Sequence, residues 1–357
     1  ALPIYSTIII KMTLQSLIDK PVELLEFIQE CLKPKDIEKK KYGEVFTPIP
    51  LINEMLDKIP MEVWKNPELK WLDPANGMGN FMIIVYFRLN EGLNDIIIDD
   101  KIRKKHILEE MLYMSEINKK NCFITKQIFD INNEYKLNIY NGDSLLLNTS
   151  QEWDIEKYDI IIGNPPYNKG FTKAGSLPLY NEFIDKFIDN CNILLFIIPS
   201  RWFSGGKGLD KFRKKMLERI DLVLINHFDD ASKIFGNNVD IKGGVQYFMK
   251  DNKYNGLCNF NGVLTFLNKY DIFVENKYND IIDYILHLES INKHYLGRYF
   301  GIESNDKNLC DNNELIKCYV SQQKGFTKYI DIKHIKKDFN FWKVITSEAS
   351  HKGSSGF

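Results

Sequence analysis

Cysteine is scarce in this sequence, and neither sign of charge is in excess. The 357 residues include six cysteines, none of them in a C-x-x-C pair, and the formal net charge is −1. Scattered cysteines argue against a zinc site and a disulfide framework, and they favour a reducing, intracellular compartment. Because no global basic field exists, any binding of nucleic acid must use local patches.

Long apolar runs and a leader sequence are also missing. No stretch approaches the roughly 20 apolar residues that a membrane helix needs. Residues 1–10 are apolar but lack a basic start and a clear cleavage site, so we do not expect a signal peptide. The chain does not begin with Met and ends in Gly-Ser-Ser-Gly-Phe, which leaves open that it is a fragment of a longer protein.

The chain is expected to have three regions. Residues 1–41 include apolar residues at helical spacing and predict an N-terminal helical segment. Short apolar strands alternate with helices over residues 42–254, which predicts an α/β domain. Residues 255–357 mix aromatic side chains with lysine and asparagine without a clear period, which suits either contact with nucleic acid or the core of a small β-rich domain.

The central motif is an apolar strand that ends in two prolines. The run Ile160–Gly163 is typical of a strand buried on both faces of a parallel sheet. It leads into Asn164-Pro165-Pro166-Tyr167. Neither proline can join a sheet ladder and each has a fixed φ, so we expect a stiff spur at the carboxyl end of the strand. Open α/β sheets bind their ligands at that end.

This spur is suited to hold a planar amine. The exocyclic amine of a nucleobase is a poor nucleophile because its lone pair is delocalised into the ring. The side-chain oxygen of Asn164 and the carbonyl of Pro165 can each accept one of its N–H bonds and so pull the nitrogen toward tetrahedral geometry. Tyr167 can stack on the ring. The alternative is a rigid turn with a surface tyrosine, and the motif alone does not decide between the two.

Three further strands are each expected to end in an acid, namely Asp73, Glu116 and Asp143. Asp73 leads into the glycine-bearing loop Pro74–Phe81, which lets the backbone approach a ligand closely. An acid there attracts an ammonium and repels a pyrophosphate, so an amino-acid ligand is favoured over a dinucleotide. Glu116 can accept both hydroxyls of a ribose. Asp143 can accept a hydrogen bond from an adenine amine.

Several other residues are candidates for contact with a ligand. Thr47 is expected to cap a helix over about residues 50–59, where it can also face a carboxylate, although a cap alone is the alternative. Phe183 and Phe235 are the two aromatic residues outside the spur that we expect to touch a ligand. Residues 168–178 are expected to form a loop beside the spur.

A basic loop follows the buried strand that is expected over residues 192–199. The segment Ser200–Gly208 contains Arg201 and Lys207 and enters a basic helix. These cations can meet phosphates, but a run of charge is also typical of a solvated helix face.

These motifs, in this order, resemble the gamma class of DNA adenine-N6 methyltransferases, including the methylase part of restriction-modification proteins that fuse a methylase with an endonuclease. The resemblance covers roughly residues 42–250 and rests on Gly43–Pro48, Asp73–Gly79 and Asn164–Tyr167. It implies the Rossmann-like fold of class I S-adenosylmethionine-dependent methyltransferases, an α/β fold with a seven-stranded, mostly parallel sheet. The seventh strand is expected to be antiparallel.

The resemblance also implies the roles of individual residues. Those implied to bind S-adenosylmethionine are Thr47, Asp73, Ala75, Asn76, Gly77, Glu116, Ile117, Asp143 and Phe183. Those implied to hold the target base are Asn164, Pro165, Pro166 and Tyr167, with Phe235 as a second stacking partner. Thr47 is implied to contact the methionine carboxylate end, and Ile117 and Phe183 the cofactor adenine. The family often has Cys or Thr where this chain has Asn76. No metal is implied.

The implied activity is that of a site-specific DNA adenine methyltransferase. It methylates N6 of an adenine that is flipped out of double-stranded DNA, by direct attack. The sequence has no Pro-Cys pair, which argues against cytosine-C5 chemistry with a cysteine nucleophile. A methyltransferase acting on RNA or on a glutamine side chain is the nearest alternative, and a non-catalytic DNA-binding or structural protein is the third. Residues 255–357 are expected to be a complete or truncated target-recognition region.

Overall fold

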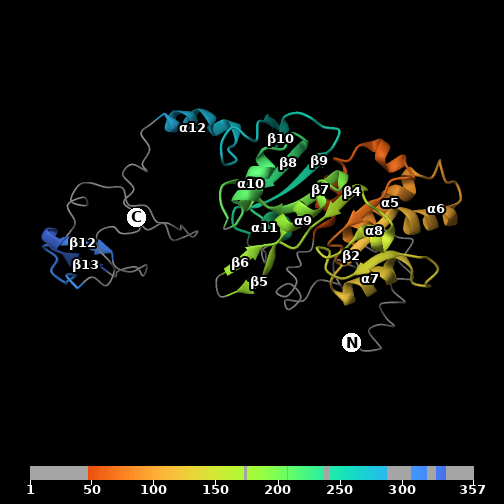
Figure 1. The fold of residues 1–357 in the computed structure, drawn as a ribbon, viewed down its shortest axis with the longest axis horizontal. Helices are drawn as coiled ribbons and strands as arrows, with labels where there is room; N and C mark the ends of the chain where they lie inside the picture. The colour runs from red at the N-terminus through yellow and green to blue at the C-terminus, as the bar shows by residue number, and fades with distance from the viewer. Residues whose placement is uncertain are drawn as a thin grey trace. The chain divides into compact units, whose positions relative to one another are not determined.

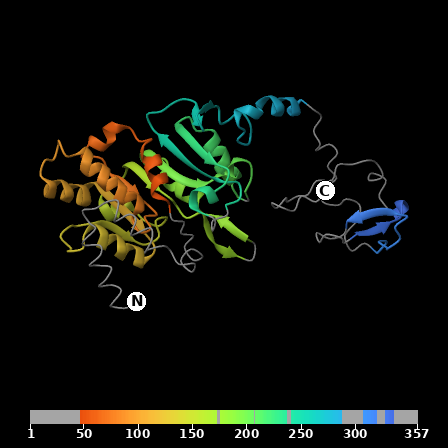
Figure 2. The ribbon, with the colours of Figure 1, turned by 180° about the vertical axis from the view of Figure 1, so that it is seen from behind.

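The computed structural model describes residues 47–172, 175–206, 208–236, 241–287, 307–319 and 327–334. The chain divides into two compact units, Ala1–Asn279 and Asp280–Phe357. Figure 1 and, from behind, Figure 2 show the first unit as a twisted sheet with helices on both faces. The predicted N-terminal helical segment, residues 1–41, lies outside the described residues.

One sheet of nine strands organises the described part of the first unit, in the order β11-β10-β8-β9-β7-β4-β1-β2-β3. β9 runs antiparallel to both β7 and β8, and β11 runs antiparallel to β10, whereas the other neighbours are parallel. The carboxyl ends of the parallel strands therefore meet at one edge, which we call the carboxyl edge. The strand bounds are β1 Trp71–Asp73, β2 Leu112–Glu116, β3 Asn138–Asn141, β4 Tyr158–Gly163, β7 Cys191–Pro199, β8 Leu222–Phe228, β9 Val245–Asp251, β10 Cys258–Phe260 and β11 Val263–Thr265.

The predicted α/β fold with an antiparallel seventh strand is confirmed, but two strands are added to it. β10 pairs in parallel with β8, and β11 returns along β10. The residues between them, Asn261 and Gly262, have positive φ angles of 47° and 89°, as a two-residue hairpin turn requires. The sheet thus continues beyond residue 254, where we expected the catalytic domain to end, and the first compact unit extends to Asn279.

The central strands are buried on both faces, as predicted for the run before the spur. Ile160 and Ile162 of β4 pack in one hydrophobic cluster, and Ile161 between them packs in the other. Successive side chains of a strand point to opposite faces, so both faces must be covered. Burying one such side chain contributes roughly 1.5–3 kcal/mol. The two clusters therefore hold β4, and the spur that follows it, in a fixed place.

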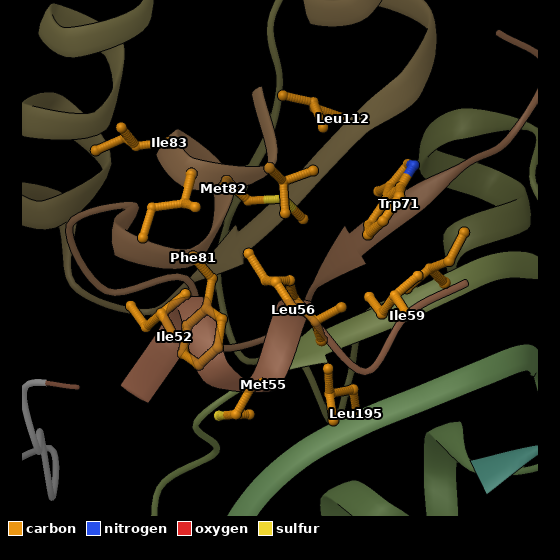
Figure 3. Packing of buried hydrophobic residues seen from close by; sticks show 14 of the residues in the cluster. Ile52, Met55, Leu56, Ile59, Trp71, Phe81, Met82, Ile83, Leu112 and Leu195 are labelled. Carbon is orange, nitrogen blue, oxygen red and sulfur yellow. The ribbon is translucent and has the colours of Figure 1, made fainter. Parts of the chain in front are cut away.

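Helices from the first half of the chain supply most of the cover on one face. In Figure 3, Ile52 and Met55 of α4 lie beside Phe81 of α5, close to Leu195 of β7. The other face is covered by α9, η3 and α10. The helix bounds are α4 Ile49–Leu56, η1 Met61–Lys65, α5 Asn80–Gly92, α6 Asp100–His106, η2 Ile107–Met111, α7 Lys119–Phe129, α8 Thr149–Trp153, α9 Tyr180–Phe187, η3 Ser200–Phe203, α10 Asp210–Leu217 and α11 Ser232–Phe235.

Two local expectations were wrong. The segment after the spur is a two-stranded hairpin, β5 Asn168–Thr172 with β6 Gly175–Pro178, where we expected a loop. Thr47 does not cap α4, because Pro48 occupies the cap position and makes no side-chain cap hydrogen bond there. In the part of the chain that is described, no helix is long and apolar enough to cross a membrane.

The carboxyl-terminal end of the chain contributes a few described elements. η4 (Asn276–Tyr278) leads into α12 (Asn279–Leu286). In the second unit, β12 (Ile316–Tyr319) pairs with β13 (Thr327–Ile330) in an antiparallel hairpin, and η6 (Ile332–His334) follows it.

Candidate active site

The spur begins directly against the acid at the end of β1. A Cβ added to Gly163 would lie 2.6 Å from Oδ1 of Asp73, and the φ of Gly163 is +149°, which L side chains rarely adopt. Glycine is therefore required at this point for two reasons. The close approach places the Asn-Pro-Pro-Tyr spur and the Asp73 loop next to each other at the carboxyl edge.

Thr47, which is far from the spur in the sequence, also lies at the carboxyl edge and contacts Asn164. Its hydroxyl accepts a hydrogen bond of 3.1 Å from the side-chain nitrogen of Asn164, across 117 positions. Thr47 is only 3% exposed, so this contact is held by the surrounding structure. The three motifs of the sequence therefore converge: Thr47 contacts Asn164, which follows Gly163, which abuts Asp73.

The glycine loop after β1 is tied to the acid at the end of β2. The backbone N–H of Gly77 donates to Oε2 of Glu116 at 2.8 Å, and that of Asn118 donates to Oε1 at 2.7 Å. Gly77 has φ of +55°, and no atom lies within 4 Å of a Cβ added there, so open space faces the loop. The Asn76 side chain is turned away toward α7, where it donates to Thr125 at 3.0 Å.

Asp73 is an acid that the fold keeps protonated near neutral pH. Burial, and to a smaller extent the negative charge of Glu116, raises the pKa of its carboxyl to about 8. A 2.9 Å hydrogen bond from the backbone N–H of Ala75 to Oδ1 favours ionisation and only partly opposes this. An ammonium group brought beside Asp73 would therefore both gain a partner and drive its ionisation.

The third strand end is fixed by two serines that the sequence reasoning did not single out. The hydroxyls of Ser115 and Ser144 lie 2.6 Å apart, and Ser144 also donates to the carbonyl of Pro74. This connection joins the ends of β1, β2 and β3. Asp143 next to it accepts from the backbone N–H of Leu145 at 2.9 Å. A small hydroxyl beside an acid at a strand end is the sequence feature that could have identified them.

The side chains of Tyr167 and Phe183 are less exposed than expected for residues that stack on a ligand. Tyr167 is 5% exposed and Phe183 is similarly buried, whereas Ile117 is 52% exposed. Burial raises the pKa of the Tyr167 hydroxyl far above its usual range, and the nearby side chain of Asn164 partly opposes this. Phe235 is half-buried against the hydrophobic cluster under α4 and α5. The structure thus places Tyr167 beside Asn164, and it records no contact between Tyr167 and Phe235 among the described residues.

The described cysteines of the first unit, Cys122, Cys191 and Cys258, are buried and have raised thiol pKa values. Burial raises the pKa of Cys122 to about 11 and those of Cys191 and Cys258 to about 12. None of them is in a disulfide. Among the described residues, no three His, Cys, Asp or Glu side chains are grouped as metal ligands would be. The polar groups available for chemistry are therefore those gathered at the carboxyl edge.

The chain matches known proteins over this part. Residues 96–235 match the family model described as Eco57I restriction-modification methylase. The chain is 28% identical to an uncharacterized adenine-specific methylase of Mycoplasma pneumoniae, over 62% of this chain and 70% of that protein. It is also 28% identical to the type II methyltransferase M.AccI of Acinetobacter calcoaceticus, over 67% of this chain and 44% of that protein.

A solved structure of the same fold is also similar. It is a modification subunit assigned to a type I restriction enzyme of Vibrio vulnificus, with a TM-score of 0.51 and 13% identity over 90% of this chain and 66% of that one. The sheet and its acid-ended strands have the fold expected of class I S-adenosylmethionine-dependent methyltransferases. The family match over residues 96–235 and the curated relatives support the resemblance to gamma-class adenine methyltransferases of the restriction-modification type.

Proposed function

We propose that this protein transfers a methyl group from S-adenosylmethionine to N6 of an adenine that is flipped out of double-stranded DNA. The observation that carries the proposal is the convergence of Thr47, Asp73 and Asn164 at the carboxyl edge. The parallel pairing of β1 with β4 brings Asp73 and Asn164 together, but it does not require Thr47 to reach them. All three must meet if one pocket is to hold both a methyl donor and its acceptor.

The residues at this edge fit the cofactor. Its ammonium would lie beside Asp73, its ribose hydroxyls at Glu116 and its adenine amine at Asp143. The space in front of Gly77, where a Cβ would meet nothing within 4 Å, leaves room for the methionine part. Ala75, Ile117 and Phe183 would supply apolar contacts, and Asn76 would contribute through its backbone. When bound, S-adenosylmethionine supplies an electrophilic methyl group.

The spur would prepare the target amine for attack. Asn164 Oδ1 and the Pro165 carbonyl would accept the two N–H bonds of adenine N6 and draw its lone pair out of the ring. Because Asn164 donates its nitrogen to Thr47, the amide plane is held and its oxygen is directed elsewhere. Pro166 stiffens the turn. Tyr167 would contact the base with a ring edge rather than a freely exposed face, and Phe235 would require a shift to stack opposite it.

DNA is the proposed acceptor because the curated relatives are named as an adenine-specific methylase and a type II methyltransferase. The same names do not favour RNA or a glutamine side chain, although the spur could hold either amine. We assign target recognition to residues beyond the sheet, in the second compact unit. An intracellular location is expected for an enzyme that acts on DNA.

The test is transfer of a labelled methyl group to DNA, RNA and protein acceptors offered side by side. Asn164→Ala is expected to lower the rate on DNA by roughly 10²–10³-fold, as loss of one preorganised hydrogen-bonding group does elsewhere. The matched control is Asn190→Ala, an exposed asparagine that bonds to the carbonyl of Lys186. Equal rates for wild type and Asn164→Ala, or a preference for RNA or protein, would overturn the proposal.

A further inference from the structure

A cavity lies immediately beside the spur, on the side away from the acids. Its wall includes Tyr167 and Asn168 after β4, Tyr180 at the start of α9, Arg201 after β7 and Lys242 before β9. No aspartate or glutamate lines it among the described residues. The described part of the wall therefore includes two cationic side chains, Arg201 and Lys242, and no acidic one.

Arg201 differs from the other described arginines. The guanidinium groups of the other four are each paired with an aspartate, as Arg88–Asp57, Arg103–Asp100, Arg213–Asp210 and Arg219–Asp221. Arg201 is exposed and makes no side-chain hydrogen bond or ion pair with any described residue. An unpaired guanidinium in a concave site is available for an anion from outside, which it can bind through two parallel N–H groups.

Tyr180 supplies a second, independent indication of a ligand. It is 2% exposed, lines the cavity, and its hydroxyl has no hydrogen-bond partner among the described residues. A buried hydroxyl without a partner is costly, and an acceptor oxygen from a ligand would satisfy it. Arg201 and Tyr180 line the same cavity. Burial raises the pKa of the Tyr180 hydroxyl, and the positive charge of Arg201 partly opposes this rise.

We propose that this cavity binds a phosphodiester group of the DNA strand that carries the target adenine, next to the flipped nucleotide. The assignment rests on the proposed function. A phosphodiester presents a negative charge and acceptor oxygens only, which complements the guanidinium of Arg201 and the hydroxyl of Tyr180. The rest of the described lining includes apolar side chains, which bring no charge that would oppose an anion. Since Tyr167 belongs to both the spur and the cavity, one nucleotide can reach both.

The experiment measures DNA affinity as a function of salt for wild type, Arg201→Gln, Lys242→Gln and Tyr180→Phe, first on a duplex of mixed sequence. Each lost contact between a cation and a phosphate, as in Arg201→Gln or Lys242→Gln, lowers the slope of log K against log salt by about one. The uncharged change Tyr180→Phe should weaken binding and leave the slope unchanged. Lys253→Gln, at an exposed turn at the opposite end of β9, is the matched control and is expected to keep the wild-type slope. Affinity for S-adenosylhomocysteine, measured by calorimetry, should be unchanged in all variants.

A methylphosphonate scan identifies the phosphate. A duplex containing the recognition sequence, read from methylated DNA, carries one neutral linkage at a time around the target adenine. One position should weaken binding by wild type several-fold and have no further effect in Arg201→Gln. Equal penalties in both proteins at every position, with an unchanged salt slope, would overturn the proposal.

The two proposals fail in different ways. If the protein binds duplex DNA with an Arg201-dependent slope but transfers no methyl group, the cavity assignment stands and the proposed function falls. Adenosine, which carries no phosphate, can be offered as the methyl acceptor in place of DNA. If Arg201→Gln methylates DNA normally and has an altered KM only for adenosine, the cavity holds the base and the phosphodiester assignment is wrong. A Tyr180→Phe variant that folds and binds as wild type does in every assay would also contradict it.

Discussion

The side-chain nitrogen of Asn164 lies 3.1 Å from the hydroxyl of Thr47, although 117 positions separate the two residues. Asn164 belongs to the spur after β4, and Thr47 lies ahead of the first described helix. Through this contact, Thr47 can fix the orientation of the Asn164 side-chain amide. The sequence implies a different role for Thr47, which is contact with the carboxylate of the cofactor, and experiments can distinguish the two roles.

Replacing Thr47 should distinguish them. Thr47→Val removes the acceptor and keeps the shape, and we expect methyl transfer in a single turnover to slow by about tenfold, the equivalent of one ordinary hydrogen bond. Thr47→Ser keeps the hydroxyl and should restore the rate. If Thr47→Val instead weakens S-adenosylmethionine binding and leaves the single-turnover rate intact, the residue acts on the cofactor.

Replacing Gly163 should disrupt both stability and the site. Gly163→Ala places a methyl group against Asp73 in a backbone conformation that disfavours it, and we expect the free energy of unfolding to fall by about 1–3 kcal/mol. Urea unfolding measures this. Gly205→Ala is the matched control, because a Cβ there meets nothing within 4 Å, and it should be neutral. A Gly163→Ala protein as stable as wild type would contradict the close approach.

The raised pKa of Asp73 makes stability and ligand affinity respond to pH in opposite directions. Its pKa is 3.8 in an exposed chain and about 8 in the fold, so the folded state binds this proton more tightly. Its contribution to the free energy of unfolding therefore decreases as the pH rises from about 4 to 8 and is constant above that. Affinity for an ammonium ligand should increase over the same range, by at most about tenfold per pH unit.

Asp73→Asn is the comparison for this pH response. Calorimetry with S-adenosylhomocysteine and urea unfolding at several pH values should both show a flatter profile than wild type. Parallel profiles in the two proteins would mean that Asp73 is ionised across this range.

Glu116 should matter for the cofactor more than for DNA. Glu116→Gln removes the charge that accepts from Gly77 and Asn118, and we expect the Kd for S-adenosylhomocysteine to rise by about tenfold, the value of a weakened charge-assisted hydrogen bond. It should also lower the pKa of Asp73, so the pH profile of affinity shifts toward lower pH. Glu218→Gln, at the exposed residue that follows α10, serves as the control. An unshifted profile would show that the two acids are not coupled.

The elements that local patterns specify were predicted well. β4 and β7 are continuous apolar runs with clear ends, and Asp73, Glu116 and Asp143 lie at or just after the ends of strands, as expected. The fold also brings the spur to Asp73, because parallel strands share a carboxyl edge. These predictions succeed because the period of apolar residues and the conformational limits of proline act over a few neighbouring residues.

The features that were missed depend on distant contacts or on an overlooked turn. Nothing near Thr47 indicates that its hydroxyl meets Asn164, and nothing near Tyr167 indicates that the β5–β6 hairpin follows it and that its ring is buried. The hairpin at Asn261-Gly262 is different, because that dipeptide between two short apolar segments is a strong turn signal. It was overlooked because no regular period was found after residue 254.

The pairing of β1 with β4 has a consequence for biosynthesis. The backbone N–H of Lys70 donates to Oδ2 of Asp159 at 2.9 Å, a contact that spans 89 positions. During translation, β1 leaves the ribosome long before β4 has been synthesised. Until then, the apolar side chains of β1 cannot pack against those of β4. Such non-local pairing slows folding. The carboxyl edge can thus be completed only after residues 158–167 have been synthesised, so premature termination upstream of the spur leaves the candidate site incomplete.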